Sequence, residues 1–406
     1  MRKAVIKNRL ATILIAVMIA VTALGGWASL FGQASAADSS VKLTYVSPSK
    51  IYSDSSKSKS KNAKTSKTKK STEAKSNKSS KSSNESSNGA PGKPPSDGQG
   101  GGQPPSGGQP PAGNQSGGQG GGANTQSYDY SGTNKGELTA SKKRVKVSNK
   151  TIKSTTADVN ALLAKSGGTL TVKNSKITKS GDDTNGDNVN FYGINSSALA
   201  VGKGSKLFLS KSSIASTSEG SNGIFSTDKA TVYANDVKIT TKKSGNSRGL
   251  DATYSGVIYA NKMNISTEGA HSAAVATDRG GGYISVTNST FKTSGSVSPL
   301  IYSTGDIEVD AVKGTATGSQ IAGIEGQNRI LIYNSSLTST NDAISGSDPI
   351  KNGVIIYQST SGDAETASSK LGDFEAVDST LKTTISGGAM FCVTNTNAKV
   401  VLQNTK

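Results

Sequence analysis

The segment GDDTNGDNVN carries oxygen-bearing side chains at alternate positions, a spacing that could bind calcium. Asp183, Asn185 and Asp187 match the first, third and fifth ligand positions of a calcium loop. The match is incomplete, because Asn188 replaces the glycine of such a loop and Ile194 replaces its last glutamate. The segment therefore has two interpretations, a turn rich in Asp and Asn or a weak Ca²⁺ site. We predict no other cofactor.

Histidine and cysteine chemistry is narrowly limited, because His271 and Cys392 are the single residues of their types. One histidine excludes a multi-histidine metal site, and one cysteine excludes a disulfide within the chain. His271 stands in TEGAHSAA without an obvious nucleophile to activate. We interpret it as a surface histidine.

Carboxylates could also act on a glycan, because a hydrolase needs two or three that converge on one bond. Asp251, Glu308, Asp310 and Glu325 are the candidates, and they fall on different predicted strands. Nothing in their spacing indicates convergence. We therefore predict no catalytic residues and no enzyme activity.

The formal charge of +18 lies mainly outside the predicted fold, which argues against a nucleic-acid-binding domain. Basic residues contribute +4 before residue 10, and ten lysines with one glutamate contribute +9 between Lys57 and Lys81. The apolar run from Leu10 to Leu24, followed by ASA at 34–36, predicts a secretory signal peptide over 1–36. An uncleaved N-terminal anchor is the competing interpretation. Apart from the signal peptide, we expect the protein to contact a membrane only through an anchor that the given sequence does not include.

Residues 37–127 predict a disordered linker, first rich in Lys and Ser and then in Gly, Pro and Gln. Such a segment has too little apolar surface to offset the entropy lost on ordering. The linker is either a solvated spacer or a cationic tether that binds a cell-wall polyanion. Release from isolated walls by added salt would support the tether.

A repeat of about 25 residues fills the remainder, 128–406. Each unit has apolar residues at its first, third and eighth places, with polar residues between, as in RILIYNSSLTST. The units begin at Val145, Leu170, Leu207, Val232, Ile258, Ile284, Ile307, Ile330, Phe374 and Val400. Two longer intervals, of 37 and 44 residues, indicate loop insertions. Gly314 is the exception to an otherwise apolar eighth place.

Short strands at a fixed period predict an all-β solenoid, a right-handed parallel β-helix in which equivalent strands stack. Each unit also carries a second apolar run before the strand, for example GLDA, PLIY, AGIE and VIIY. Asn at the fourth or fifth place suits a bend whose amides hydrogen-bond along the stack. The last unit ends at Lys406 and leaves Val400 and Leu402 without a covering turn. We expect the natural chain to continue beyond Lys406 with a cap, and an anchor or a further module could follow it.

The blocks NFYGINSSALA, ATDRGGG, IYSTGD, IEGQN, IYQSTSGDAE and MFCVTNTN resemble secreted, adhesin-like β-helix proteins of bacteria. That group has the pectate-lyase-like superfamily fold and no assigned activity, and the resemblance covers roughly 190–397. Cys392 departs from it, since an aromatic residue is usual there. Lyases on this fold use an Arg or Lys base beside Ca²⁺-binding acids. Here Arg248, Arg279 and Arg329 occupy different phases of the repeat, so we expect ion pairs, Arg248 with Asp251 and Arg279 with Asp278.

Three aromatic residues take the second, outward-facing place of consecutive units: Phe208, Tyr233 and Tyr259. Their rings are expected to stack as an exposed row that could bind sugar rings, unless a loop covers them. The sequence thus favours a secreted bacterial cell-surface protein, either an adhesin that binds an extracellular polysaccharide or a structural stalk. A polysaccharide lyase or hydrolase and a passive spacer for a further module remain alternatives.

Overall fold

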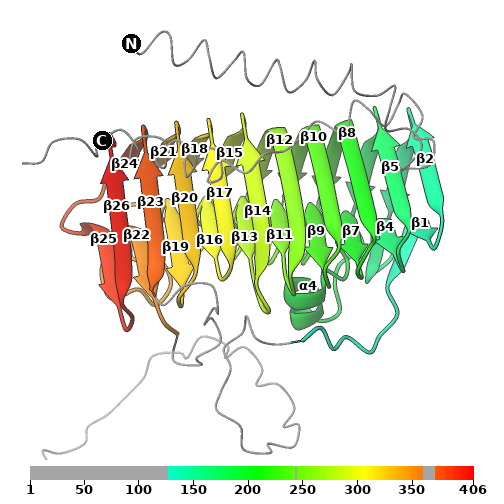
Figure 1. Cartoon of the computed structure of the whole chain (residues 1–406), viewed down its shortest axis with the longest axis horizontal. Helices are drawn as coiled ribbons and strands as arrows, with labels where there is room; N and C mark the ends of the chain where they lie inside the picture. The colour runs from blue at the N-terminus through cyan, green and yellow to red at the C-terminus, as the bar shows by residue number, and fades with distance from the viewer. Residues whose placement is uncertain (1–126, 243–244, 360–370) are drawn as a thin grey trace, which may run out of the picture. The chain divides into compact units, whose positions relative to one another are not determined.

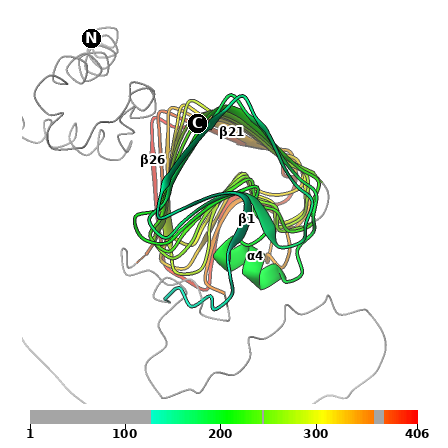
Figure 2. The ribbon, with the colours of Figure 1, turned by 90° about the vertical axis from the view of Figure 1, so that its right-hand side faces the viewer.

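The chain folds as a parallel β-solenoid in the computed structural model, which describes residues 127–242, 245–359 and 371–406. Figure 1 shows the strands stacked in sequence order from β1 and β2 at one end to β25 and β26 at the other. Seen along the axis, successive coils superimpose around one interior (Figure 2). The predicted signal peptide and linker, 1–36 and 37–127, lie outside the described residues except for Ser127.

Ten parallel strands form one sheet, here called the first sheet. Each is followed in space by its equivalent from the next coil. In spatial order they are β1 (Lys135–Ser141), β4 (Val159–Lys165), β7 (Ala198–Val201), β9 (Ile224–Thr227), β11 (Leu250–Ala252), β13 (Val275–Thr277), β16 (Ile301–Ser303), β19 (Ala322–Glu325), β22 (Asn352–Tyr357) and β25 (Ala389–Thr394).

Sixteen strands form the second sheet. It bends at the same place in each coil and so covers two sides of the solenoid (Figure 2). Its main path is β2 (Arg144–Ser148), β5 (Thr169–Lys173), β8 (Lys206–Ser216), β10 (Thr231–Thr241), β12 (Gly256–Thr267), β14 (Gly282–Thr287), β17 (Asp306–Asp310), β20 (Arg329–Tyr333), β23 (Gly372–Val377) and β26 (Ala398–Gln403). Beyond the bend lie β3 (Thr151–Ser154), β6 (Lys176–Lys179), β15 (Thr290–Thr293), β18 (Lys313–Ala316), β21 (Ser336–Ser339) and β24 (Thr380–Thr383).

The predicted repeat register is confirmed. The ten unit starts pair with one another in unbroken succession, from Val145 with Leu170 to Phe374 with Val400. The eighth places pair in the same way, from Ile152 with Ile177 to Leu337 with Leu381. Repetition of one apolar pattern at each coil is therefore enough to fix which residues stack.

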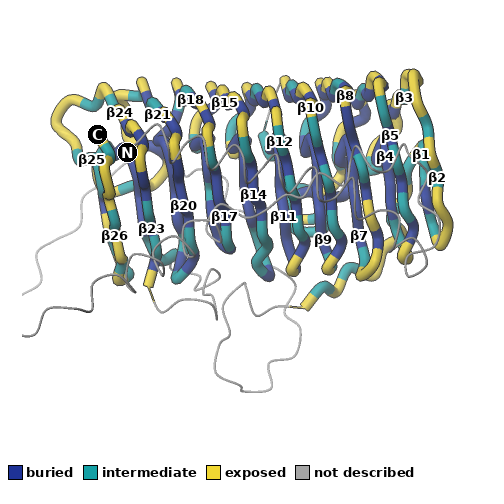
Figure 3. The backbone as a smooth tube through the Cα atoms, turned by 45° about the horizontal axis from the view of Figure 1, so that its top comes forward, coloured by how far each residue is buried: buried dark blue, intermediate teal, exposed yellow. Residues whose placement is uncertain are grey.

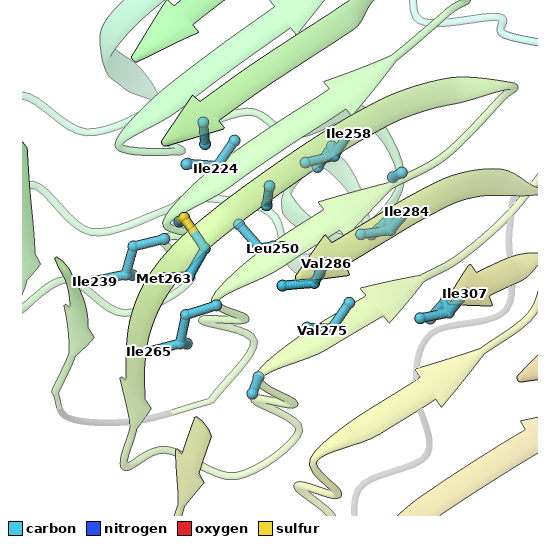
Figure 4. Close-up of a cluster of buried hydrophobic side chains, with 14 of the residues drawn as sticks. Ile224, Ile239, Leu250, Ile258, Met263, Ile265, Val275, Ile284, Val286 and Ile307 are labelled. Carbon is cyan, nitrogen blue, oxygen red and sulfur yellow. The ribbon is translucent and has the colours of Figure 1, made fainter. Parts of the chain in front are cut away.

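The interior is a continuous stack of mainly aliphatic side chains from both sheets. Figure 3 marks the strands that carry these side chains as largely buried. In Figure 4, Leu250 and Val275 of the first sheet face Ile258, Ile284 and neighbouring residues of the second. Burying one such side chain contributes about 1.5–3 kcal/mol. At the last coil Val400 and Leu402, which continue inward rows, are 38% and 49% exposed.

The bend of the second sheet falls at the fifth place of the repeat, and the backbone there is left-handed in all ten coils. The residues with φ between 47° and 58° are Asn149, Asn174, Lys211, Asp236, Lys262, Asn288, Ala311, Asn334, Asp378 and Asn404. Asn and Asp tolerate this conformation best among residues with a side chain. In two coils the fifth place is Asp236 or Lys262, and asparagine stands one position earlier. There Asn261 Nδ2 donates a hydrogen bond to Asn235 Oδ1 at 2.8 Å.

Ala311 is the poorest residue for this bend, since it has a Cβ and no polar group to hydrogen-bond locally. We expect Ala311→Gly to raise the free energy of unfolding by about 1 kcal/mol, measured by urea denaturation. At the equivalent position of the next coil, Asn334→Ala should lower the free energy of unfolding. Part of this loss comes from the 2.7 Å hydrogen bond that Asn334 Nδ2 donates to Asp310 Oδ1. Equal stabilities for the parent and Ala311→Gly would show that the bend carries no strain.

Gly314, the exception at the eighth place, is explained by its neighbours. A Cβ at this residue would lie 2.7 Å from Leu300 Cδ1 and 2.9 Å from Leu337 Cδ2. Leu300 therefore occupies the interior volume that the side chain of residue 314 would fill. The interior row at the eighth place therefore stays packed, with the Leu300 side chain in place of one at residue 314.

The longer interval after Ser180 contains a helix that the strand periodicity does not predict, α4 (Gly186–Tyr192). It lies on the outside of the solenoid, against the first sheet (Figure 2). Asn222 donates to the carbonyl of Val189 at 3.2 Å, and Thr253 donates to that of Phe191 at 2.8 Å. Within the described ranges, no helix has the length and apolar character needed to cross a membrane.

Candidate functional site: a polar groove and an aromatic row

One row of outward-facing side chains runs along the first sheet and changes character midway. It begins with Leu163, Leu199 and Phe225, which form a small apolar cluster with Tyr128. Gly193, the C-cap of α4, lies against Phe225 and leaves no room for a Cβ. From the next coil onward the paired residues are Asp251, Ala276, Tyr302, Gly323, Ile355 and Cys392. The row is therefore wholly apolar up to Phe225, and beyond it includes the polar residues Asp251 and Tyr302.

A groove of about 680 Å³ lies along part of this second half of the row. Tyr302, Gly323 and Ile355 line its floor, and Arg248 and Asp278 line the end nearer α4. The loop at 345–349 lines it farther along. A concave site of this size, with aromatic, aliphatic and charged side chains together, is typical of a ligand-binding site.

Arg248 is held between two carboxylates at the end of the groove. It is 8% exposed, and its Nη1 lies 2.8 Å from Asp251 Oδ2 while its Nη2 lies 2.9 Å from Asp278 Oδ2. Asn190 of α4 accepts a further hydrogen bond from Nη1 at 3.2 Å. The expected pair of Arg248 with Asp251 is confirmed. Asp278, however, pairs with Arg248, whereas the Arg279 guanidinium lies 3.8 Å from the centroid of the Phe191 ring.

Burial dominates the electrostatics of Asp251, which is fully enclosed. Loss of water raises the pKa of its carboxyl to about 7, although Arg248 opposes the shift. The nearby carboxylates raise the pKa of Arg248 against its desolvation, so the guanidinium stays charged. A charged guanidinium with two carboxylate partners has no capacity to accept a proton.

Glu325 is the centre of a second polar cluster, on the neighbouring strands β16, β19 and β22. Tyr302 and Tyr357 both donate their hydroxyl hydrogens to Glu325 Oε2, Tyr357 at 3.1 Å. Burial raises the pKa of both phenols, so they remain neutral donors. The carboxylate is thereby oriented by two fixed hydrogen bonds.

A third polar cluster surrounds Asp348. Its Oδ2 accepts from Gln320 Nε2 at 2.9 Å and from Asn352 Nδ2 at 2.7 Å. Burial raises the pKa of this carboxyl, and the two amides oppose the rise. Asp348 and Glu325 thus share one arrangement, with two donors on one oxygen.

The predicted aromatic row lies on the second sheet, not in the groove. Phe208 and Tyr233 are stacked with centroids 4.9 Å apart and planes at 7°, and Tyr233 and Tyr259 at 5.5 Å and 20°. The rings therefore stack as the sequence predicts, but each residue is half-buried, not fully exposed. Tyr283 ends the stack with an edge-on contact to Tyr259.

The predicted calcium residues take structural roles in the segment before α4. Asn185 is the N-cap of α4, with its side-chain oxygen accepting from Asn188 N at 3.1 Å. Asp187 lies exposed in the first turn of the helix, and the Asp183 backbone N–H donates to Glu219. No group of three His, Cys, Asp or Glu side chains suited to a metal occurs in the part of the chain that the structure describes. A Ca²⁺ site here remains a prediction.

The other singled-out residues are distributed over the solenoid. His271 is exposed, as predicted, and lines the groove; partial burial and Arg248 lower its pKa. Arg329 pairs through two hydrogen bonds with Asp306 on the second sheet. Glu308 and Asp310 also lie on that sheet, in β17, whereas Asp251 and Glu325 face outward on the first sheet. The four carboxylates do not converge on one point.

Comparison with protein-family models, with curated proteins and with solved structures finds no match to this chain. Its function must therefore be inferred from its sequence and from the surfaces of the solenoid.

Proposed function

We propose that this chain is a secreted, cell-surface β-helix protein that binds extracellular polysaccharide as an adhesin or stalk and does not cleave it. The observation that carries the proposal is the stack of Phe208, Tyr233 and Tyr259, whose rings follow one another at 4.9 and 5.5 Å. Three such rings form a strip of roughly 10 Å, comparable with two or three sugar units. The apolar faces of sugars pack on aromatic rings of this kind.

Secretion and surface retention are supported by the sequence. The signal peptide predicted over 1–36 and the lysine-rich part of the linker fit export followed by contact with an anionic wall. The resemblance to adhesin-like bacterial β-helix proteins of the pectate-lyase-like superfamily points the same way. A passive spacer for a further module is the weaker alternative, because a spacer has no need of stacked aromatic residues.

The groove argues for binding over cleavage. A lyase needs an arginine or lysine that can accept a proton, yet Arg248 is fixed by Asp251 and Asp278. A hydrolase needs a proton donor and a base that face one bond, and Glu325 is instead committed to two tyrosines. We therefore expect polygalacturonate, with or without Ca²⁺, to yield no unsaturated product absorbing in the ultraviolet. Formation of such a product would favour a lyase.

The triple variant Phe208→Ala, Tyr233→Ala, Tyr259→Ala is expected to stay folded and to lose retention on a polysaccharide array about tenfold. Weak contacts of this kind are best detected on a multivalent surface. Circular dichroism checks the fold. The control Tyr233→Phe keeps the ring and should keep retention, because stacking needs no hydroxyl. Unchanged retention by the triple variant would remove the aromatic row as the site.

A further inference from the structure

Cations gather on one side of the first three coils. In each coil, the ten residues from four before the unit start to five after it cover the turn into the second sheet, the strand and the bend. In the first three coils these segments (141–150, 166–175 and 203–212) contain nine Lys or Arg and no Asp or Glu. In the other seven coils together they contain five Lys or Arg and eight Asp or Glu. We call this side of the first three coils the basic face; its cations are Lys142, Lys143, Arg144, Lys146, Lys150, Lys173, Lys203, Lys206 and Lys211.

The charges of the basic face are accessible. Arg144 and Lys206 each stand one residue before an inward unit start, and both are exposed. Lys203 is exposed in the turn before β8. Within the described residues, no ion pair involves Arg144, Lys203 or Lys206. Such a group of like charges repels itself and is stabilised by a partner of opposite charge.

Protection of a sheet edge does not account for the basic face. Cations on an edge strand hinder pairing with another sheet, and β2 is an edge strand, so Arg144 and Lys146 could serve that purpose. The strands β5 and β8, however, are paired on both sides. Lys173, Lys206 and Lys211 lie on those two strands, where there is no edge to protect.

The basic face is continuous with the aromatic row. Phe208 lies between Lys206 and Lys211 on β8. The outward row that contains the three rings starts at Lys146 and passes through Thr171 to Phe208. The strands β2, β5, β8, β10 and β12 follow one another along this side of the solenoid (Figure 1). Five stacked strands span roughly 19 Å, comparable with four sugar units. One polysaccharide chain can therefore contact the cations and the rings together.

We propose that the polysaccharide bound by this chain is acidic, with its charged groups on the basic face and its sugar rings on the aromatic row. This inference rests on the function proposed above and names the class of glycan that the row receives. Carboxylate, sulfate or phosphate groups on the sugars accept charge-assisted hydrogen bonds from Lys and Arg. The chain's own cations contact these groups directly, so no bridging metal is needed. Added Ca²⁺ competes for the same oxygens and weakens the complex.

Two matched pairs of polymers test the class of glycan, by retention of the full chain on an array. Polygalacturonate is compared with its methyl ester, and dextran sulfate with dextran. We expect an acidic polymer to retain the chain at least about tenfold more strongly than its neutral counterpart, and retention to fall as NaCl or Ca²⁺ is added. The pair that shows the larger difference distinguishes carboxylate from sulfate.

The possible failures are distinguishable. Equal retention on acidic and neutral polymers would overturn the acidic class and leave the aromatic row as a glycan site. Stronger retention with Ca²⁺ would overturn direct pairing with the chain's cations. No retention on any of the four polymers would contradict the proposed function itself.

Variants assign the preference to the basic face. The triple variant Arg144→Gln, Lys203→Gln, Lys206→Gln removes three exposed cations and should weaken retention on the preferred acidic polymer about tenfold. Retention on its neutral counterpart should not change. The lysine-rich linker, which also attracts polyanions, is the same in the variant and the parent, so the difference reports the solenoid.

The matched control removes the same charge from strands beyond the bend, through Lys153→Gln, Lys176→Gln, Lys238→Gln. All three lysines are exposed, and this variant should retain the acidic polymer nearly as the parent does. Equal losses in the two triple variants would overturn the basic face as the site, because net charge alone would then govern retention. The aromatic-row triple variant should also lose retention on the acidic polymer. Parent-like retention there, with loss in the Arg144, Lys203 and Lys206 variant, would overturn the shared site.

Discussion

Replacing Ile332 with aspartate is expected to unfold the middle of the solenoid. Ile332 is fully buried in β20, between Val309 and Ala376 of the adjacent coils. A carboxylate there would have no partner, and burying it costs several kcal/mol. Far-UV circular dichroism and thermal melts should show a large loss of structure or a much lower melting temperature.

The control for this change is Thr338→Asp, in β21 of the same coil. Thr338 alternates with the buried Leu337 and Ser339 and is only half-buried, so its new charge can reach water. It should change the free energy of unfolding by no more than about 0.5 kcal/mol. Melting curves for Ile332→Asp that match those of the parent would contradict the inward assignment of the row.

The stacking register could be predicted because each coil repeats the same constraint. An apolar residue at the first, third and eighth places must face inward at every coil, and one residue of slippage would expose the whole row. Even Ala311, with no polar side chain, adopts the same left-handed bend as Asn334. The periodic environment therefore decides the conformation, and individual propensity only modulates its free energy.

The groove could not be predicted by the same reasoning. Several of its residues stand in the second apolar runs: Tyr302 in PLIY, Gly323 in AGIE, and Ile355 and Tyr357 in VIIY. Those runs predict a buried strand, and polar residues within them signal that one face of that strand meets a different environment. Reading the outward positions in register across coils would have brought Asp251 and Tyr302 into one row. The partners Arg248 and Asp348 come from loops, whose paths do not repeat.

Insertions account for the remaining differences. The 37-residue interval supplies α4, whose docking covers Phe225 and brings Asn190 to Arg248. Helical periodicity is hard to recognise in a segment as short as seven residues. The two parts of the first sheet consequently differ: α4 covers an apolar surface at one, and the groove lies along Tyr302, Gly323 and Ile355 at the other.

Replacing Arg248 with methionine is expected to lower the free energy of unfolding by about 3–5 kcal/mol, measured by urea denaturation near neutral pH. The change leaves Asp251 fully buried beside Asp278 with no cation. Methionine retains most of the packing, so the loss reports the missing guanidinium contacts and the cost of protonating the Asp251 carboxylate or burying it without a cation. The double variant Arg248→Met, Asp251→Leu removes the buried charge as well and should recover much of the stability. Additive losses in the two single variants and the double variant would show that the residues are not coupled.

The cost of losing Arg248 should grow with pH. In the parent, burial already raises the pKa of Asp251 from 3.8 to about 7. The contribution of Asp251 to the free energy of unfolding is therefore fully present below pH 3.8, the pKa of the unfolded chain, and decreases as the pH rises to about 7. Without Arg248 the carboxyl loses the charge that favours its ionised form, and its pKa rises further. In Arg248→Met, the contribution of Asp251 to the free energy of unfolding therefore keeps decreasing above pH 7, by no more than about 1.4 kcal/mol per pH unit. The deficit of Arg248→Met relative to the parent should accordingly be larger at pH 8 than at pH 5, where Asp251 is neutral in both proteins. A deficit that stays constant between these two pH values would mean that Arg248 acts through packing alone.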